Sequence, residues 1–412
     1  MRRCFVINYS DGRSDPPTRM CAEAFAKLGF HVTIIQGPRL AAIKTEPLAN
    51  VSVVEVGRYV SSIRVAFLRS LARWILFRFV VFFMMKIQSP EVVVTLMLHA
   101  LAAVPKRRSR SILIACIYDI PVMEDTGRLD ALILDKGWSR LRDADVVWSS
   151  DPYKATATAS IGHLSKPPIV VYNCPSTDYI QSDSFYRDPW LRSELINTGM
   201  SVDDETCIII RAGAIGPLGG IEETIEALQR LPPKLVFLLM GRPDTAYAEN
   251  LRALIISCCL QDRVILWEAP NDTIWKLALQ GADVGHLIHG PLWEGKLLRS
   301  YQVNSSLSNN RLFQYMAASL PILSYNDPRL DRLHREVGCF EVVRVEQMVD
   351  DIEKACAKLS ASAELRYQMG ARGRQAHLDF YNWGHQFSKV LTTVLQDPLF
   401  SNVKGKDKCA SL

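Results

Sequence analysis

The sequence predicts an α/β protein made of two Rossmann-like domains, each built on a doubly wound parallel sheet. Strand-like apolar runs alternate with helix-like segments along the chain, which is typical of parallel sheets with crossover helices. The alternation starts again near residue 206 with a new strand, a glycine-rich loop and a helix. A length of 412 residues fits two or three domains of ~100–200 residues each. We therefore expect an N-terminal domain at 1–195, a C-terminal domain at 196–380, and a cleft between them.

The first half opens with a strand, a helix and a second strand. Residues 4–10 read CFVINYS and form an apolar strand, residues 19–28 have helical spacing that ends at Gly29, and residues 31–37 form the next strand. Further strands are expected at 51–56, 91–98, 111–119, 145–150 and 168–173. A polar stretch at about 176–205 then separates the two domains.

The second half repeats this organisation. Residues 206–216 read TCIIIRAGAIG, a strand that runs into a glycine-rich loop, and residues 220–231 follow as a helix. Further strands, with helices between them, are expected at 234–241, 263–269, 283–290 and 320–325.

The charge is uneven between the halves. Residues 1–200 hold 25 Lys and Arg against 18 Asp and Glu, whereas residues 201–412 hold 23 against 25. A basic half indicates a surface for phosphates, anionic lipid or nucleic acid, or only an uneven solvated surface. No recognised module supports nucleic-acid binding, so no nucleic-acid partner is expected. The ten cysteines show no zinc-site spacing and indicate free thiols in a reducing, cytoplasmic compartment.

Residues 62–86 form an unusual apolar segment. Four arginines interrupt it (Arg64, Arg69, Arg73 and Arg78), and its uninterrupted part is shorter than the ~20 residues that a membrane span requires. One reading is a helix in a membrane surface with its arginines on lipid phosphate. The other is a domain helix packed against the sheet, whose arginines extend to solvent. The first reading adds a peripheral location on the inner face of the membrane.

Two features of the second half could bind a phosphate. The loop from Arg211 to Gly220 follows a strand and precedes a helix, so its backbone N–H groups could approach a diphosphate. Any tight turn also needs glycine. A helix that starts at 310–312 would present first-turn N–H groups in the same way. Gln314 lies one turn into that helix and is either a hydrogen-bond donor to a ligand hydroxyl or a surface amide.

Residues 310–323 carry the most specific motif. They read NRLFQYMAASLPIL and resemble the NKLFEYMAAGLPVI signature of retaining glycosyltransferases of the family 4 type, which have the GT-B fold. Four other segments resemble parts of the same family: the first strand and acceptor loop, the donor loop, the base-binding segment and the C-terminal return helix, at 8–35, 211–228, 264–288 and 380–387. The resemblance implies two Rossmann-like domains facing a cleft, and a final segment, 381–412, that packs on the N-terminal domain and ends in a polar tail.

The resemblance also implies a donor site for a nucleotide-diphosphate sugar. Its residues here would be Arg211, Gly213, Ala214, Gly216, Lys296, Asn310, Arg311, Leu312 and Gln314. The chain departs from the family at Gln314, where the family has the glutamate that holds the ribose, and at Ser319, where it has a helix-start glycine. Ala214 and Gly219 stand where the family brings a cation to the diphosphate. Arg211 or Arg311 could substitute, because a guanidinium binds phosphate through two parallel hydrogen bonds, and Lys296 is another candidate cation.

The acceptor side is expected in the N-terminal domain. The catalytic candidates are Asp11, Asp119 and His99, and the acceptor-binding candidates are Gly12, Arg13, Asp15 and Glu124. Carboxylates at the carboxyl ends of parallel strands face the ligand side of such sheets, although helix N-caps explain single acids equally well. The family motif Tyr-Asp-x-His is Tyr118-Asp119-Ile120-Pro121 here, without its histidine. His99 could replace it or be structural.

The sequence thus predicts a glycosyltransferase that moves a sugar from a UDP- or GDP-sugar to a glycan, a lipid-linked acceptor or a small molecule, with retention. The nucleotide sugar is a co-substrate, and no metal or cofactor is expected. One alternative is a non-catalytic relative that binds glycan or a partner transferase. A sugar-nucleotide epimerase of the same fold is a third hypothesis.

Overall fold

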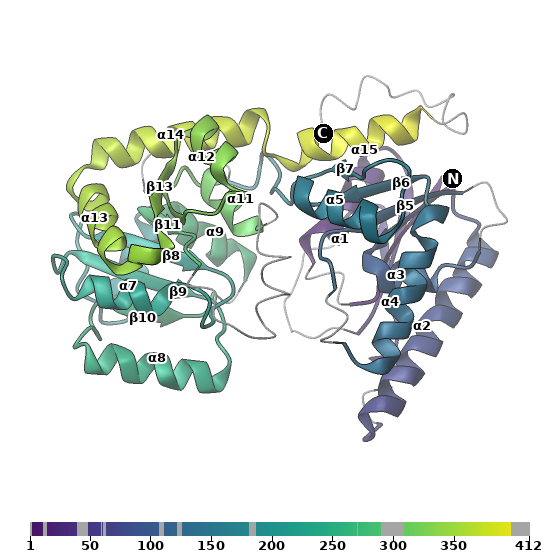
Figure 1. The fold of residues 1–412 in the computed structure, drawn as a ribbon, viewed down its shortest axis with the longest axis horizontal. Coiled ribbons are helices and arrows are strands. Elements are labelled where there is room, and N and C mark those ends of the chain that lie inside the picture. The colour runs from purple at the N-terminus through teal and green to yellow at the C-terminus, as the bar shows by residue number, and fades with distance from the viewer. Residues whose placement is uncertain are drawn as a thin grey trace. The chain divides into compact units, whose positions relative to one another are not determined.

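The computed structural model describes residues 2–10, 15–38, 48–58, 60, 63–106, 111–121, 126–180, 187–269, 271–289 and 309–396. The described residues form two compact units (Figure 1). One holds the chain up to Asn173 together with the segment from Trp383, and the other holds the chain from Cys174 to Asn382. Both are α/β units with parallel sheets, so the predicted fold class is confirmed.

The first unit has a seven-stranded parallel sheet in the order β3-β2-β1-β4-β5-β6-β7. The strands are β1 (Arg3–Asn8), β2 (His31–Gln36), β3 (Val51–Glu55), β4 (Val92–Leu96), β5 (Ile112–Ile117), β6 (Val146–Ser149) and β7 (Ile169–Val170). The order reverses between β1 and β4, and doubly wound sheets bind ligands outside the carboxyl ends of the strands at such a switch point.

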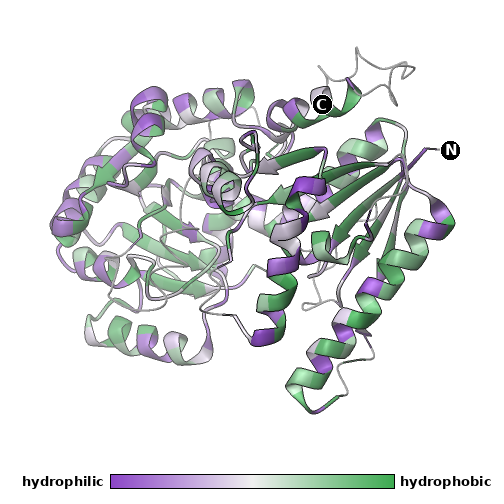
Figure 2. Cartoon of the chain, turned by 45° about the vertical axis from the view of Figure 1, so that its right-hand side comes forward, coloured by the Kyte–Doolittle hydropathy of each residue, from purple (hydrophilic) through white to green (hydrophobic). Residues whose placement is uncertain are grey.

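Helices cover both faces of this sheet. They are α1 (Pro16–Lys27), α2 (Ala66–Gln88), α3 (Met97–Ala103), α4 (Arg128–Arg140), α5 (Pro152–Ile161) and α15 (Trp383–Leu395). Side chains alternate along β1: Cys4 and Val6 pack in a core with α1 and α15, whereas Phe5 and Ile7 pack in a core with α2, α3 and α4. This period of two with apolar residues on both sides explains why the strands read as continuous apolar runs. Figure 2 shows both sheets as largely hydrophobic.

Helix α15 belongs to the first unit although it follows the second in sequence. The ring of Trp383 stacks on Phe387 at 4.7 Å between centroids and meets Trp148 of β6 edge-on at 6.2 Å. Phe387 also contacts Phe25 of α1 at 6.1 Å. Aromatic pairs of this kind stabilise a core beyond the area that they bury.

The second unit has a six-stranded parallel sheet in the order β10-β9-β8-β11-β12-β13. The strands are β8 (Cys207–Ala212), β9 (Leu235–Met240), β10 (Val264–Trp267), β11 (Val284–His286), β12 (Ile322–Tyr325) and β13 (Phe340–Val343). The helices are α6 (Trp190–Asn197), α7 (Ile221–Leu228), α8 (Thr245–Ser257), α9 (Asp272–Gly281), α11 (Asn310–Ala317), α12 (Asp331–Val337), α13 (Met348–Ala361) and α14 (Ala363–Asp379).

The units divide at Asn173 and Asn382, where the sequence analysis set boundaries at 195 and 380. A buried carboxylate explains why the chain before 195 packs with the second unit. Asp283 accepts hydrogen bonds from the guanidinium of Arg192 at 2.8 Å and from the N–H of Ile208 at 2.9 Å. This contact fixes α6, at the end of the stretch that looked merely polar, to the start of β8.

Several elements differ from the expectation. Residues 97 and 98 were predicted to extend a strand but begin α3, where Met97 has a φ of 68° that ends the strand. Helix α1 begins at Pro16, three residues early, because the Asp15 side chain caps it. Strand β13 was not expected, because its four residues lie at the sheet edge and include a charged Glu341.

The described cysteines are all free thiols, and seven of the nine are buried. None of the helices in the described part of the chain is long and apolar enough to cross a membrane.

Candidate functional site

The glycine-rich loop between β8 and α7 has a backbone that requires glycine. Gly213 has a φ of 118° and Gly220 a φ of 60°, both in the left-handed range that side chains disfavour. A Cβ on Gly241, at the end of β9, would collide with the carbonyl oxygen of Gly213. The loop therefore depends on a glycine outside its own sequence. Within the loop, the N–H of Gly219 donates to the carbonyl of Gly216 at 2.9 Å.

Arg211 holds this loop from inside. Its side chain is buried, and Nη1 donates to the carbonyl oxygens of Gly219 at 2.8 Å and Ile288 at 2.9 Å. Nε lies 3.4 Å from the carbonyl oxygen of Ala214. The guanidinium predicted as a donor-binding cation is thus engaged by backbone carbonyls.

His286 and Thr224 extend this support, and the sequence analysis did not single them out. His286 Nδ1 lies 3.2 Å from Nη1 of Arg211, and because a guanidinium only donates, Nδ1 accepts. Nε2 then carries the proton and donates to Thr224 Oγ1 at 2.9 Å, whose hydroxyl donates to the Gly220 carbonyl at 2.6 Å. Burial, then the charges of Arg211 and Arg311, hold the pKa of His286 well below its usual value, which keeps this neutral tautomer.

Arg311 is a second buried guanidinium beside the loop. Its side chain is 7% exposed, and Nη2 donates to the carbonyl of Ala214 at 3.3 Å. Nε and Nη1 are buried and have no hydrogen-bond partner among the described residues. Burial lowers the pKa of both Arg211 and Arg311, and their mutual repulsion lowers that of Arg211 further. An isolated buried charge is costly, so an anion bound here would be strongly stabilised.

The start of α11 lies beside the same guanidinium. Asn309 caps the helix: its side-chain oxygen accepts the N–H of Arg311 at 3.1 Å, and its carbonyl accepts the N–H of Leu312 at 3.0 Å. The sequence predicts that the N–H groups of Asn310, Arg311 and Leu312 hold the diphosphate. Those of Arg311 and Leu312 are already engaged by Asn309. The side chain of Leu312 is fully buried.

Helix α11 is fixed to the sheet by Tyr315, one residue after Gln314. The buried Tyr315 hydroxyl accepts the N–H of Ala212 at 3.0 Å and lies 3.0 Å from the carbonyl of Ile210. A Cβ on Gly285 would collide with its ring, so β11 has a glycine where the ring passes.

Gln314 is half-buried, and its side chain interacts with the hydroxyl of Tyr179. The ammonium of Lys276, on α9, lies 4.8 Å from the centre of the Tyr179 ring. Neither Tyr179 nor Lys276 was a predicted site residue, because nothing in the sequence indicates that 174–180 packs beside α9 and α11.

In the first unit, Asp15 is the N-cap of α1. Its carboxylate accepts from the N–H of Thr18 at 3.1 Å, from the amide of Asn8 at 3.2 Å and from the hydroxyl of Tyr118 at 3.2 Å. Burial raises the pKa of Asp15, although the hydrogen bonds from Thr18 and Tyr118 lower it. The N-cap alternative stated from the sequence therefore describes its position, whereas its acceptor role stays a prediction.

Asp119 follows β5 and forms an ion pair with a lysine that the sequence analysis missed. Nζ of Lys154 lies 2.9 Å from the Asp119 carboxylate and 2.7 Å from the carbonyl of Tyr118. The lysine side chain is 1% exposed and that of Asp119 is 51% exposed. The pair leaves one side of the carboxylate open at the carboxyl end of the strand.

His99 lies on α3, just beyond the end of β4. Its ring stacks on that of Tyr9 at 5.4 Å, and Nε2 lies 3.8 Å from the carboxylate of Asp130. The guanidinium of Arg73, on α2, lies over the same Tyr9 ring, 4.9 Å from its centroid. Burial lowers the pKa of His99, although Asp130 opposes this shift. The first unit thus brings His99, Tyr9 and Asp130 together.

Five predicted site residues, Asp11, Gly12, Arg13, Glu124 and Lys296, lie outside the described residues.

Known proteins resemble this chain in its C-terminal half and in its fold. Residues 222–392 match the model of a family described as "Glycosyl transferase-like". No curated protein matches the sequence. Sucrose-phosphate synthase from Thermosynechococcus elongatus superposes with a TM-score of 0.71 at 16% identity, over 97% of this chain and 100% of that one.

Two other solved structures have the same architecture. WaaG, a glycosyltransferase involved in lipopolysaccharide biosynthesis, gives a TM-score of 0.64 at 13% identity over 96% of this chain and 100% of its own. HepE from Anabaena, in complex with UDP-glucose, gives a TM-score of 0.62 at 13% identity over 99% of this chain and 100% of its own. Identities this low show the fold alone. Residues 222–392 thus match a glycosyltransferase-like family, and the chain as a whole shares its fold with solved glycosyltransferases.

Proposed function

We propose that this protein binds a nucleotide-diphosphate sugar, a UDP- or GDP-sugar, in its second unit and transfers the sugar, with retention, to a hydroxyl group. The acceptor would be a glycan, a lipid-linked acceptor or a small molecule. The observation that carries the proposal is Arg311, a buried guanidinium beside a glycine-rich loop and a helix start, two of whose nitrogens have no partner among the described residues. HepE, whose fold this chain shares, has been solved with UDP-glucose, which supports the same class of donor.

The residues take the following roles in this proposal. Nε and Nη1 of Arg311 bind the diphosphate and stabilise the charge that grows on it as the sugar leaves. The N–H groups at the start of α11 also bind the diphosphate once a phosphate oxygen replaces the Asn309 side chain as their acceptor. Gln314 turns from Tyr179 to a ribose hydroxyl. Arg211 keeps the loop in place and does not bind the donor itself.

The leaving diphosphate takes the proton of the attacking hydroxyl, so neither a protein nucleophile nor a metal is required in this proposal. Asp119, held by Lys154, and His99 lie at the carboxyl ends of β5 and β4. That is where ligands bind in doubly wound sheets, and we assign these two side chains to the acceptor.

Calorimetric titration of the purified protein with UDP, GDP, ADP and TDP tests the donor site. Micromolar binding of one diphosphate is expected and would name the base. If a folded protein binds none of the four, the donor proposal fails, and a non-catalytic relative that binds glycan or a partner transferase becomes the better hypothesis.

The ribose contact has its own test. Gln314→Ala should weaken binding of the diphosphate by ~1 kcal/mol, the scale of one hydrogen bond. Gln375→Ala, which removes an exposed amide on α14 of the same unit, is the matched control and should leave binding unchanged. Equal affinity of the two variants would exclude Gln314 from the donor site.

A further inference from the structure

Helix α2 is apolar on two opposite sides. Trp74, Phe77 and Val81 form its buried side and pack in the core of the first unit. The outer side carries large apolar residues that are exposed: Leu68, Ile75, Leu76, Phe79, Phe82, Phe83 and Ile87. Phe79 and Phe83 are 58% and 51% exposed although their rings touch at 5.4 Å. Figure 2 shows this long helix as mostly hydrophobic along its length.

The outer side of α2 forms one straight apolar stripe, which can lie along a flat apolar surface. Ile75, Phe79 and Phe83 follow one another at intervals of four residues, so they form a single stripe along the helix. At 1.5 Å per residue the helix is about 35 Å long. An apolar patch of this extent on a soluble domain indicates a docking surface.

The charges around the stripe specify the partner. Residues 56–90 contain six Lys and Arg and no Asp or Glu. On a helical projection, Arg69 lies at one edge of the stripe and Arg78 at the other, and both are exposed. Arg69 and Arg78 thus flank the outer stripe, whereas the opposite side of the helix is buried in the core. Basic residues on both edges of an apolar stripe match anionic phospholipid.

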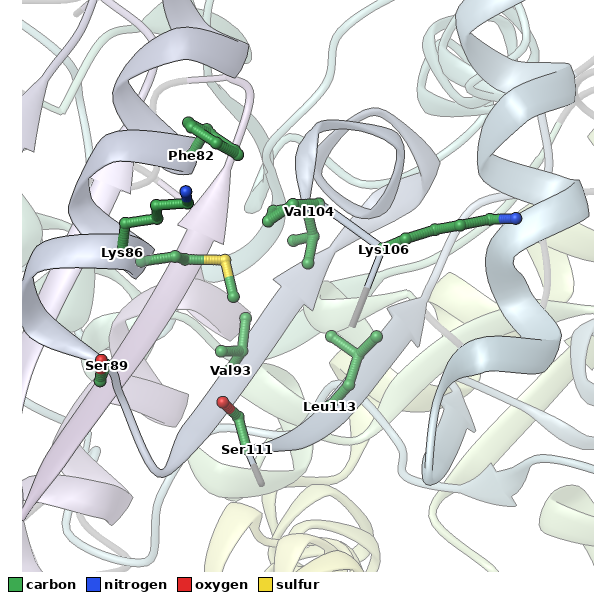
Figure 3. Close-up of a pocket in the computed structure, with 10 residues that line it drawn as sticks. Phe82, Lys86, Ser89, Val93, Val104, Lys106, Ser111 and Leu113 are labelled. Carbon is green, nitrogen blue, oxygen red and sulfur yellow. The ribbon is translucent and has the colours of Figure 1, made fainter. Parts of the chain in front are cut away.

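A cavity adjoins the C-terminal end of α2. It has a volume of about 540 Å³ and shares Phe82, Met85 and Lys86 with the helix (Figure 3). Val93 and Leu113, near the amino ends of β4 and β5, form its apolar wall, and Lys106 also lines it. Since ligands of doubly wound sheets bind at the carboxyl ends, this cavity is distinct from the acceptor side. An apolar wall with two lysines suits the upper acyl chain and phosphate of an anionic lipid.

We propose that the outer side of α2 docks the protein on membranes that contain anionic phospholipid, with Arg69, Arg78 and Lys86 on lipid phosphate and the apolar stripe among the acyl chains. The proposal does not depend on the donor site in the second unit.

Flotation with phosphatidylcholine vesicles, with and without phosphatidylglycerol, tests this proposal on the full chain. Wild type should float only with phosphatidylglycerol. Phe79→Ser/Phe83→Ser should lower the bound fraction about tenfold. Ile256→Ser/Phe380→Ser, which changes two equally exposed apolar residues of the second unit, is the control and should float like wild type.

The charges are tested separately. Arg69→Glu/Arg78→Glu should weaken partitioning onto phosphatidylglycerol vesicles by at least ~30-fold. Arg252→Glu/Arg335→Glu, with the same change of net charge on the second unit, should weaken it far less. Lys86→Ala/Lys106→Ala should lower affinity for phosphatidylglycerol vesicles if the cavity takes part.

Three outcomes would overturn the proposal: no flotation of wild type, equal flotation of the stripe variant and its control, or a lipid-free dimer that the stripe variant abolishes. The last would make the stripe an interface between two copies of the chain. Urea unfolding of the α2 variants that matches the wild type shows that they remain folded.

Discussion

Two buried arginines beside one loop perform different tasks, and the difference can be measured. Arg311→Met removes a buried charge, two of whose nitrogens have no partner in the described part of the chain, while it keeps most of the side-chain volume. Diphosphate affinity should fall ~10- to 100-fold, since a hydrogen bond to a charged group contributes about 1.5–3 kcal/mol. Stability in urea should stay equal or rise, because an uncompensated buried charge is lost.

Arg211→Met is the matched comparison. This guanidinium donates to the carbonyls of Gly219 and Ile288, which the variant would leave buried and unpaired. The free energy of unfolding should drop by roughly 2 kcal/mol or more. If Arg311→Met proves the more destabilising of the two, Arg311 is a structural residue and the donor proposal loses its main support.

His377, at the end of α14, makes stability depend on pH. Its side chain is fully buried, Nδ1 lies 2.7 Å from the carbonyl of Tyr381, and burial lowers its pKa to about 4. In the unfolded chain its pKa is about 6.5. Between these values the unfolded state binds a proton that the folded state does not. The contribution of the neutral His377 to the free energy of unfolding is therefore complete above about pH 6.5 and is lost as the pH falls to about 4.

The loss should reach about 3 kcal/mol for this single group. Urea unfolding of the wild type and of His377→Gln across this pH range checks it. The variant should be less stable than the wild type near neutral pH and lose less stability on acidification. Parallel pH profiles of the two proteins would contradict the assignment.

At the scale of elements, the end of α11 carries strain that one substitution should relieve. Ser319 has a φ of 56°, and its N–H donates to the carbonyl of Met316 while that of Leu320 donates to Tyr315. The prediction that Ser319 stands at a helix start was wrong: it follows the helix end at Ala317, where a left-handed residue reverses the chain.

Ser319→Gly should raise the free energy of unfolding by about 1 kcal/mol, because glycine adopts this conformation without a steric cost. Differential scanning calorimetry measures the gain. Ser360→Gly, in the last turn of α13, should instead destabilise by a similar amount. A Ser319→Gly protein no more stable than the wild type would mean that the serine side chain contributes to the fold.

On the scale of the whole molecule, the chain builds the first unit from both of its ends. Phe387 of α15 packs against Trp383 and Phe25, so Phe387→Ala should destabilise by ~3–5 kcal/mol. Hydrogen exchange should accelerate in β1 and β6 of the first unit and stay unchanged in β8 and β9 of the second. Equal acceleration in both sheets would show that the two units unfold as one.

The sequence by itself determined the fold class, nearly all the strands and the loop before α7, because buried parallel strands read as long apolar runs and tight turns require glycine. It also predicted the helix that starts at Asn310, since the motif there is specific. It missed β13, an edge strand with few buried side chains.

Only the tertiary structure decided which arginine is free to act. Arg211 and Arg311 look alike in sequence, but Nη1 of Arg211 is engaged by two backbone carbonyls, whereas Nε and Nη1 of Arg311 have no hydrogen-bond partner among the described residues. His286, Thr224, Lys154 and Tyr179 gain their positions in the same way, from strands and helices far apart in the chain. The spacing of apolar residues along the sequence indicates whether a segment is a helix or a strand. The partner of a buried polar group depends instead on how the helices and strands pack.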